Sequence, residues 1–298
     1  MKKYCIVGAS VRCYGMFAKT LTEDFNQYVS IEGIYDTNIT RSRYFNRTIS
    51  EKIKVFEDFD HMIDTVKPDA VIVTTIDSKH HEYCIRAMEK GCDVICEKPL
   101  AIDEKQCREI TETERRTGKK VTVTFNCRFM PYYARLKELV MQNRVGKVLN
   151  INFEYLLGKW HGGDYFRRWH RKRENSGTLL VHKSTHHLDI CTWLLDDTPK
   201  TVTALGGLNY FGANRDKRGI RCSDCDHKDS CEYYWDYKAD PFLKEFYADA
   251  EINDGYTRDA CPFSDEVNIY DNMSLSVRYD KGALVTYTLT TYNPYEGY

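Results

Sequence analysis

The lysine of Glu97-Lys98-Pro99 is the residue in this sequence best placed to do proton chemistry. It follows the short apolar run 94–96, which predicts a buried strand with Lys98 at its carboxyl end. Burial and neighbouring charges can shift the pKa of a lysine, and the proline restricts the backbone behind it. Lys98 is therefore a candidate catalytic residue. The alternative is a surface lysine at a strand end before a turn.

A second group of titratable residues occurs between residues 179 and 189. Helical spacing would place His182, His186 and Asp189 along one face, with Lys183 and His187 on the adjacent face. Imidazole exchanges protons near neutral pH, so His186 and His182 are candidate catalytic residues, and Lys183 and His187 are candidate substrate contacts. Metal ligation by His182 and His186 is one alternative. Structural histidines with satisfied hydrogen bonds are the other.

Aromatic and basic residues alternate in the segment 159–172. Aromatic rings stack on the apolar faces of sugars, while arginine and histidine bond hydroxyls or a carboxylate. The candidate sugar contacts are Trp160, His161, Arg168 and Trp169. A basic RNA-binding patch is disfavoured, because the formal net charge is -1 and no compatible fold is apparent. A solvated loop with incidental charges remains an alternative.

Four cysteines suggest a metal site in the second half of the chain. Cys222, Cys225 and Cys231 have the spacing of a zinc knuckle or an iron-sulfur loop, and Cys261 lies further on. A structural four-thiolate site would pin a cysteine-rich insertion over residues 212–262, with zinc preferred to an iron-sulfur cluster. Reduced free cysteines and a disulfide are the alternatives.

The predicted elements that must position these residues change along the chain. Residues 1–125 alternate strands (4–7, 29–35, 70–75, 94–96, 121–125) with helices (16–25, 59–66, 80–90, 104–117). Such βαβ units predict an α/β fold with a doubly wound parallel sheet, a dinucleotide-binding Rossmann domain. Longer alternating strands (147–157, 201–208, 272–279, 283–290) predict a substrate-binding α+β domain over residues 126–298. Its sheet is expected to be open and mostly antiparallel.

The loop after the first strand keeps only Gly8 of the G-x-G-x-x-G dinucleotide fingerprint. Ser10 leaves a small side chain and a hydroxyl near the expected pyrophosphate, and Val11 and Arg12 follow it as further candidate cofactor contacts. Asp36, at the end of the second strand, can bond the ribose hydroxyls of NAD and would repel the extra phosphate of NADP. The alternatives are that the Gly8 loop is a purely structural turn and that Asp36 is an ordinary aspartate of a turn. Together these residues favour NAD over NADP.

With these segments the chain resembles the glucose-fructose oxidoreductase, inositol dehydrogenase and rhizopine catabolism (Gfo/Idh/MocA) family. The matching segments are 67–75, His80-His81, 91–99, 126–128, 146–148 and 176–180, continuing to His186. The resemblance implies that nicotinamide lies at the carboxyl ends of the strands, with Lys98 beside the reacting carbon of a sugar or polyol. It further implies cofactor contacts by Thr75, His80 and Glu97, and a substrate contact by Arg128.

The chain departs from the family at the pattern Asp-x-Gly-x-His-x-x-Asp. His186 and Asp189 match this pattern, whereas His182 replaces the first aspartate and Ser184 replaces the glycine. The replacement alters the proton relay and the substrate contacts that the resemblance implies. It leaves His186 as the candidate for proton transfer at neutral pH.

These observations predict an NAD(H)-dependent oxidoreductase. It would transfer a hydride between nicotinamide and a carbinol or keto carbon of a sugar, polyol or glycoside, while Lys98 and His186 manage the hydroxyl proton. One alternative is redox-assisted glycoside cleavage with recycled NAD, for which His182 and Lys183 offer further bases. Another is a sensor that binds NAD and a sugar without turnover.

The composition limits the partners. A chain of 298 residues with 42% hydrophobic and 29% charged residues is ordinary for two globular domains, and its near-neutral charge gives no reason to expect nucleic acid or a membrane. No apolar stretch reaches the roughly 20 residues of a membrane span, and the first residues lack signal-peptide features. We expect a cytoplasmic homo-oligomer acting on a small carbohydrate. We also expect a fragment, because family members usually carry further strands beyond 283–290.

Overall fold

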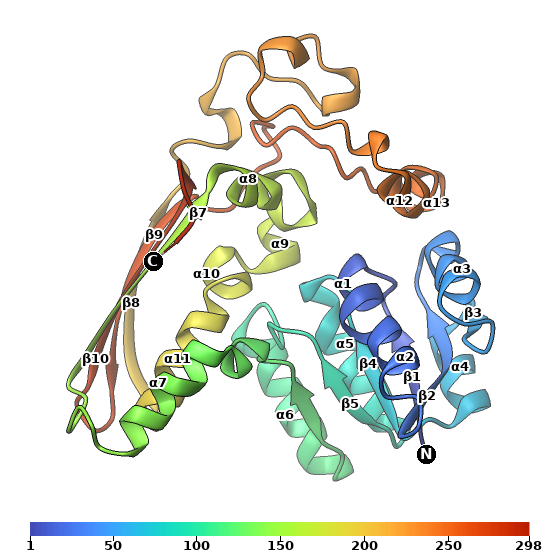
Figure 1. Ribbon diagram of the computed structural model, residues 1–298, viewed down its shortest axis with the longest axis horizontal. Coiled ribbons are helices and arrows are strands. Elements are labelled where there is room, and N and C mark those ends of the chain that lie inside the picture. Colours follow the sequence, from blue (N-terminus) through green and yellow to red (C-terminus); the bar gives the residue numbers. More distant parts are fainter. Residues whose placement is uncertain (298) are drawn as a thin grey trace. The chain divides into compact units, whose positions relative to one another are not determined.

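The computed structural model describes residues 1–297, which form two compact units. The first unit contains Met1–Thr124 together with Asp236–Arg258, and the second contains Phe125–Trp235 together with residues 259–297. The sequence prediction placed residues 236–258 in the insertion of the second domain. In the structure this segment instead packs with the first 124 residues (Figure 1).

A parallel six-stranded sheet forms the centre of the first unit, in the order β3-β2-β1-β4-β5-β6. Its strands are β1 (Lys2–Val7), β2 (Val29–Tyr35), β3 (Lys54–Phe56), β4 (Ala70–Val73), β5 (Asp93–Cys96) and β6 (Val121–Val123). The apolar residues of β4 are buried, as expected for a sheet covered on both faces. The strand order reverses between β1 and β4. This is the doubly wound Rossmann arrangement, with its switch point between those two strands.

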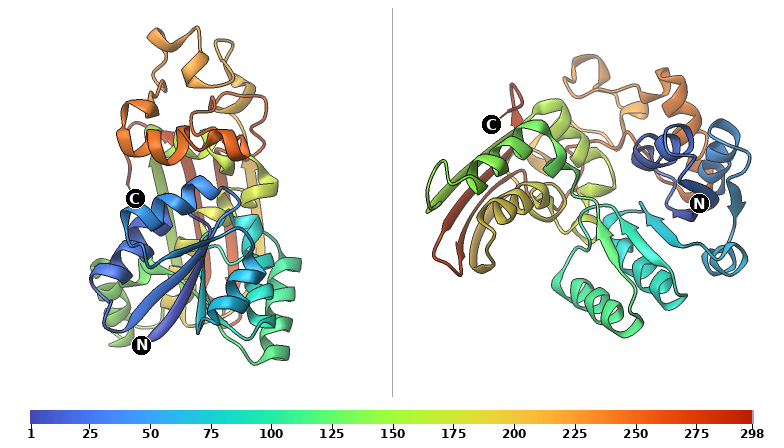
Figure 2. Two further views of the ribbon diagram at one scale, coloured as in Figure 1. Left: turned by 90° about the vertical axis from the view of Figure 1, so that its right-hand side faces the viewer. Right: turned by 60° about the horizontal axis from the view of Figure 1, so that its bottom comes forward.

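Helices cover this sheet. They are α1 (Val11–Cys13), the π-helix η1 (Tyr14–Lys19), α2 (Thr20–Glu23), α3 (Ile39–Thr48), α4 (Phe59–Val66), α5 (Asp77–Glu89) and α6 (Glu104–Thr117). Helices α5 and α6 lie side by side (Figure 2). Asp103 caps α6 by accepting from the Gln106 amide at 2.8 Å, and Gly118 ends the helix with a left-handed φ of 69°. These local signals explain why α6 begins and ends where the sequence predicted.

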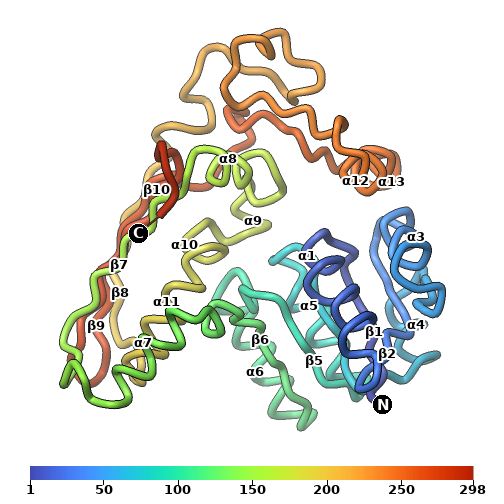
Figure 3. Tube along the Cα trace, in the orientation of Figure 1, coloured from blue at the N-terminus to red at the C-terminus, as the bar shows by residue number. Residues whose placement is uncertain are grey.

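The late segment adds the remaining helices of the first unit. They are η7 (Tyr237–Ala239), α12 (Pro241–Leu243), the π-helix η8 (Lys244–Ala248) and α13 (Glu251–Asp254). Helix η8 lies against α3, and α12 and α13 contact α3 through Phe242 and Asn253 (Figure 3). Phe246 is fully buried there, its ring 6.1 Å from that of Phe45. Burial of such aromatic side chains explains why the segment joins the first unit.

A mixed four-stranded sheet forms one layer of the second unit, in the order β7-β10-β9-β8 (Figure 1). The strands are β7 (Asn150–Gly158), β8 (Pro199–Gly207), β9 (Asn272–Tyr279) and β10 (Leu284–Asn293). Strand β10 is parallel to β7, and the other two pairings are antiparallel. Residues of β9 alternate between buried and exposed, so the sheet has one covered face. This agrees with the predicted open, mostly antiparallel sheet.

The helices of the second unit are mostly short. They are η2 (Asn126–Phe129), α7 (Pro131–Met141), α8 (Lys159–Arg167), η3 (Trp169–Arg171), α9 (Arg173–Ser176), α10 (Leu179–His182), α11 (Thr185–Leu195), η4 (Gly212–Asn214), η5 (Cys222–Asp224) and η6 (Lys228–Ser230). Tyr133 of α7 packs with Ile190 and Leu194 of α11 in a small apolar cluster. No helix within residues 1–297 combines the length and the apolar character needed to cross a membrane.

We expect Gly8→Ala to destabilise the protein by about 3 kcal/mol. Gly8 has a φ of 96°, and a Cβ there would lie 2.5 Å from the Thr75 amide nitrogen. Gly15→Ala is the matched control, because its Cβ would meet nothing within 4 Å, and we expect a change within about 1 kcal/mol. Urea unfolding of both variants measures the difference. Equal stabilities would contradict this account of the loop.

Candidate functional site

The loop after β1 is held tightly against the end of β4. The Thr74 hydroxyl donates to the Gly8 carbonyl at 2.6 Å and lies 3.2 Å from the Val7 carbonyl. The loop therefore meets the Thr74-Thr75 backbone at the switch point of the sheet. In doubly wound folds this is the place where a dinucleotide binds.

A helical stretch begins directly after this loop. The Ser10 hydroxyl accepts a hydrogen bond from the Cys13 amide at 3.1 Å and so caps α1. Val11 and Arg12 form the first turn, where backbone amides favour an anion. The predicted pyrophosphate contacts Gly8, Ser10, Val11 and Arg12 thus form one loop and one helix start.

Two of the predicted cofactor residues pair with each other. The Arg12 Nε donates to Glu97 Oε1 at 2.9 Å, which links the first loop to the end of β5. The other Glu97 oxygen accepts from the Lys98 amide at 3.2 Å. Glu97 is buried and Lys98 is half-buried. The pair places the Lys98 backbone beside the loop that follows β1.

Asp36 at the end of β2 is already well bonded. One of its oxygens accepts from the Ala9 amide at 2.7 Å, and the other accepts from the Asn38 amide at 2.7 Å and from Arg41 Nη2 at 3.2 Å. Burial raises the pKa of Asp36, and the Arg41 guanidinium and the two amides oppose this shift. Asp36 thereby ties the first loop to the turn before α3.

The His80 ring contacts the backbone of both the Lys98-Pro99 segment and Thr75. Its Nδ1 lies 2.7 Å from the Pro99 carbonyl and its Nε2 lies 3.1 Å from the Thr75 carbonyl. Only 1% of the residue is exposed, and this burial lowers the pKa of His80. Both ring nitrogens therefore face backbone carbonyls. This geometry gives His80 a positioning role between the ends of β4 and β5.

An aromatic and imidazole cluster occupies the second unit, formed by His161, Tyr165, Trp169, His170 and His182. The His182 ring centroid lies 4.3 Å from that of His170 and 5.6 Å from that of Trp169. Trp169 stacks on His170 at 3.6 Å, and Tyr165 lies 5.3 Å from His161. Three of the predicted residues, His161, Trp169 and His182, thus meet in one cluster.

A carboxylate borders this cluster. Glu296 accepts from the Tyr155 hydroxyl at 2.9 Å and lies 2.8 Å from His161 Nδ1. Burial pushes the pKa of Glu296 upward, but the hydrogen bonds from His161 and Tyr155 outweigh it and leave the pKa below its usual value. The Lys183 ammonium lies 5.0 Å from the centre of the Tyr155 ring. Burial lowers the pKa of Lys183, against the attraction of Glu296.

The predicted histidine face is divided between two short helices. His182 ends α10, while His186 and His187 lie in the first turn of α11. His187 Nδ1 is 2.7 Å from the Tyr287 hydroxyl, and its ring stacks on Phe153 at 4.7 Å. His187 therefore packs against the sheet. His186 is 8% exposed, as is His182.

Arg128 has a partner within its own unit. Its Nε and Nη2 donate to the two oxygens of Asp189 at 2.7 and 2.5 Å. This bidentate pair raises the pKa of Arg128 and fixes η2 to α11. Arg128, predicted as a substrate contact, thus uses its guanidinium to hold Asp189.

The two other predicted sugar contacts lie on α8 and just after it. Trp160 is exposed, with its ring centroid 6.0 Å from that of Tyr233. Arg168 donates to Asp164 at 2.8 Å. Trp160 is therefore the more accessible of the two.

Sequence reasoning missed several members of the second-unit cluster. Tyr165 and His170 belong to the segment 159–172, whose aromatic and basic residues predicted a sugar site. The same composition could therefore have indicated these two residues. Tyr155 lies in a strand and Glu296 lies 135 residues from its partner His161. No local spacing indicates a pairing of this length.

The predicted four-cysteine metal site is not supported. Among the described residues, no three His, Cys, Asp or Glu side chains are grouped so that they could hold a metal ion. Burial raises the pKa of Cys222 and Cys261, and the neighbouring Cys225 and Cys231 raise that of Cys261 further. No disulfide links any two cysteines within residues 1–297.

Hydrogen bonds hold the insertion instead. The Cys222 amide donates to the Asp259 carbonyl at 2.8 Å, and the Cys261 amide donates to the Ile220 carbonyl at 2.9 Å. The buried Asp259 carboxylate also bonds Arg221 and Ser223. These contacts join the two ends of the insertion, residues 220–223 and 259–261.

Two family models match the chain. One is described as "Oxidoreductase family, NAD-binding Rossmann fold" and matches residues 2–125, and the other as "Oxidoreductase family, C-terminal alpha/beta domain" and matches residues 137–297; they are the Gfo/Idh/MocA models. A relative from Bacillus subtilis, printed as "Putative oxidoreductase YteT", is 35% identical over 100% of this chain and 74% of its own length. Inositol 2-dehydrogenase 2 of Saccharopolyspora erythraea is 30% identical over 52% of this chain. That match spans 43% of the inositol enzyme.

A solved structure shares the fold. The WlbA dehydrogenase from Bordetella pertussis, in complex with NADH and UDP-GlcNAcA, superposes with a TM-score of 0.73 at 15% identity. The superposition covers 99% of this chain and 74% of that protein. The likeness supports the fold of both units.

We expect His80→Gln to destabilise the protein more at pH 7.5 than at pH 5. The unfolded imidazole binds a proton near pH 6.5, but burial lowers the pKa of His80 in the folded chain. Its contribution is therefore complete above about pH 6.5 and is lost as the pH falls toward the folded pKa. At pH 7.5 the loss should be about 1–3 kcal/mol, from a buried hydrogen bond.

Urea unfolding at both pH values measures this difference. His81→Gln, at the neighbouring half-buried histidine, is the control for loss of an imidazole from α5. A His80→Gln effect that grows toward pH 5 would refute the positioning role.

Proposed function

This chain belongs to the Gfo/Idh/MocA oxidoreductase family, and we propose that it is an NAD(H)-dependent oxidoreductase acting on a sugar, polyol or glycoside. One observation carries the proposal. The Gly8 loop, Asp36 and Lys98 follow the carboxyl ends of β1, β2 and β5, so all three lie at one edge of one parallel sheet. The relative named inositol 2-dehydrogenase supports a polyol or sugar as the substrate class.

The residues of the first unit fit a dinucleotide. Gly8 allows close backbone approach, Ser10 and the helix start at Val11 and Arg12 would hold the pyrophosphate, and Asp36 would bind the ribose. Thr75, next to the Gly8 loop, would border the cofactor. When bound, the nicotinamide supplies the hydride chemistry.

We assign Lys98 the transfer of the proton to or from the substrate hydroxyl. The Glu97 carboxylate accepts from its amide, and His80 holds the following Pro99 carbonyl, so the backbone on both sides of Lys98 is fixed. A fixed ammonium can donate to a forming alkoxide, or accept its proton when neutral. His186 is proposed as a second proton-transfer group.

The second unit is proposed to bind the carbohydrate. The exposed ring of Trp160 and the cluster around Trp169 offer stacking faces, and His161 and Lys183 offer polar groups. The partly exposed His161 and Glu296 can bond hydroxyls. A cytoplasmic location and a homo-oligomeric state complete the proposal.

Redox-assisted glycoside cleavage is a second candidate, favoured by Lys183. Oxidation of a sugar hydroxyl to a ketone acidifies the adjacent C–H, a base removes that proton, and the glycosidic substituent leaves. Burial lowers the pKa of Lys183, so more of this amine is neutral and able to accept a proton than for an ordinary lysine. In this route the hydride returns, so reduced cofactor does not accumulate.

One assay separates these functions. The protein is incubated with NAD and a panel of sugars, polyols and glycosides, and reduced cofactor and products are followed together. Net reduced cofactor supports the dehydrogenase. Glycoside cleavage without net reduction supports the second candidate. Saturable binding with neither outcome supports a sensor and overturns both enzymatic proposals.

We expect Lys98→Met to lower kcat by at least about 100-fold while the Kd for NADH stays within about threefold. The substitution removes the proton-transfer group but leaves the Gly8 loop and Asp36 intact. Lys105→Met is the matched control, because Lys105 is largely exposed on α6 and should leave turnover unchanged. Retained activity in Lys98→Met would remove Lys98 from the chemistry.

A further inference from the structure

The late segment Asp236–Arg258 meets the first unit beside its candidate ribose-binding residue. Phe246 of η8 packs 5.2 Å from Tyr44 and 6.5 Å from Tyr14, measured between ring centroids. Phe242 adds a contact at 5.6 Å to Tyr14. Aromatic packing therefore fixes the segment against α3 and the helical stretch after β1.

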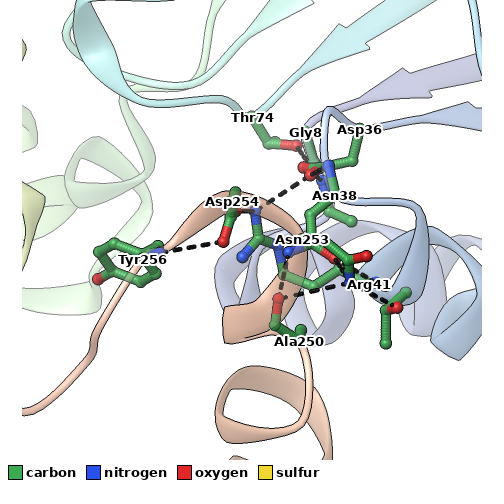
Figure 4. Close-up of polar contacts among 11 residues, drawn as sticks. Gly8, Asp36, Asn38, Arg41, Thr74, Ala250, Asn253, Asp254 and Tyr256 are labelled. Atoms are coloured by element: carbon green, nitrogen blue, oxygen red, sulfur yellow. Dashed lines mark hydrogen bonds and ion pairs between the residues drawn. The ribbon is translucent and has the colours of Figure 1, made fainter.

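Polar contacts fix the end of this segment next to Asp36. The buried Asn38 side chain donates to the Ala250 carbonyl at 2.8 Å, and the Asn253 amide donates to the Thr40 hydroxyl at 2.8 Å. Figure 4 shows these contacts beside Gly8 and Asp36. The turn that follows β2 thus forms hydrogen bonds with a segment more than two hundred residues away in the sequence.

Arg41 lies between two carboxylates at this place. Its Nη2 is 3.2 Å from Asp36 and 2.5 Å from Asp254 (Figure 4). The exposed fraction is 11% for the Arg41 side chain and 21% for that of Asp254. The second oxygen of Asp254 accepts from the Tyr256 amide at 3.1 Å, which orients the carboxylate toward Arg41. One guanidinium thus serves two acids.

This arrangement resolves an ambiguity in the sequence. In Rossmann domains an acid at the end of the second strand favours NAD, whereas a nearby arginine can accommodate the 2′-phosphate of NADP. This chain has both, Asp36 and Arg41, five residues apart. Asp254 occupies the arginine and adds a second negative charge. A 2′-phosphate would have to displace Asp254 and lie near two carboxylates.

We propose that Asp254 is a specificity-determining residue that favours NAD over NADP by engaging Arg41. The inference rests on the proposed function, since it concerns the cofactor of the same site. It assigns selectivity to the late segment as well as to Asp36. Removing the Asp254 charge frees Arg41 for a 2′-phosphate.

The test is the affinity of the full chain for NADH and NADPH, measured by fluorescence titration at one ionic strength. In Asp254→Asn we expect the preference for NADH to fall about tenfold, through tighter NADPH binding, as one charge-assisted hydrogen bond is released. The Kd for NADH should stay within about threefold, because Asp36 is retained. Asp254→Ser repeats the test with a second side chain in case the first variant folds poorly.

Two further variants isolate the mechanism. Asp249→Asn removes a carboxylate from the same segment, where it pairs with the half-exposed Lys244, and should leave the preference unchanged. Arg41→Met combined with Asp254→Asn should abolish the gain in NADPH affinity, because the freed guanidinium is absent. A gain that persists without Arg41 would overturn the proposal.

The remaining outcomes also test the role of Asp254 and separate it from the proposed function. An unchanged preference in Asp254→Asn overturns the role of Asp254 and leaves the proposed function standing. Tighter binding of NADPH than of NADH by the wild-type chain overturns the role of Asp254 and the assignment of NAD(H), but not the oxidoreductase class. Binding of neither cofactor by the wild-type chain overturns both.

Discussion

The close approach of Gly8 to the Thr74-Thr75 backbone is the constraint on which the first unit depends. A side chain at residue 8 would collide with this backbone, and the Thr74 hydroxyl bonds the Gly8 carbonyl in the buried interior. From Thr75 a further contact leads through His80 to Pro99. The candidate pyrophosphate loop and the candidate proton-transfer lysine are therefore held by one connected set of backbone contacts. Burial makes each of these hydrogen bonds costly to lose.

The second unit organises its polar groups differently. Imidazole and indole rings stack on one another, and the Glu296 carboxylate bonds both His161 and Tyr155 at its border. Ring packing fixes the orientation of these side chains, and burial lowers the pKa of the neighbouring Lys183. Tyr165, His170 and His182 are buried, whereas His161 and Trp169 are partly exposed.

The segment 236–258 changes how the chain should be divided. It follows the cysteine-rich loop, yet its aromatic side chains find their partners on α3 and on the helical stretch after β1. Buried Asp259, just after the segment, bonds Ser223 and Arg221 and so closes the base of the insertion. Within residues 1–297 no group of three possible metal ligands accompanies those hydrogen bonds. The same segment supplies Asp254, which engages an arginine beside the candidate ribose site.

The sequence by itself determined several of the elements and the strand-end positions of Gly8, Asp36 and Lys98, although α3 and β3 were not predicted. The predicted elements 29–35, 59–66, 104–117 and 272–279 match β2, α4, α6 and β9, because apolar period and capping residues act over a few neighbouring positions. Only the tertiary structure decided the break between α10 and α11 and the pairing of Arg41 with Asp254. Those two residues are 213 positions apart, and no local pattern encodes which side chains packing brings together over such a separation.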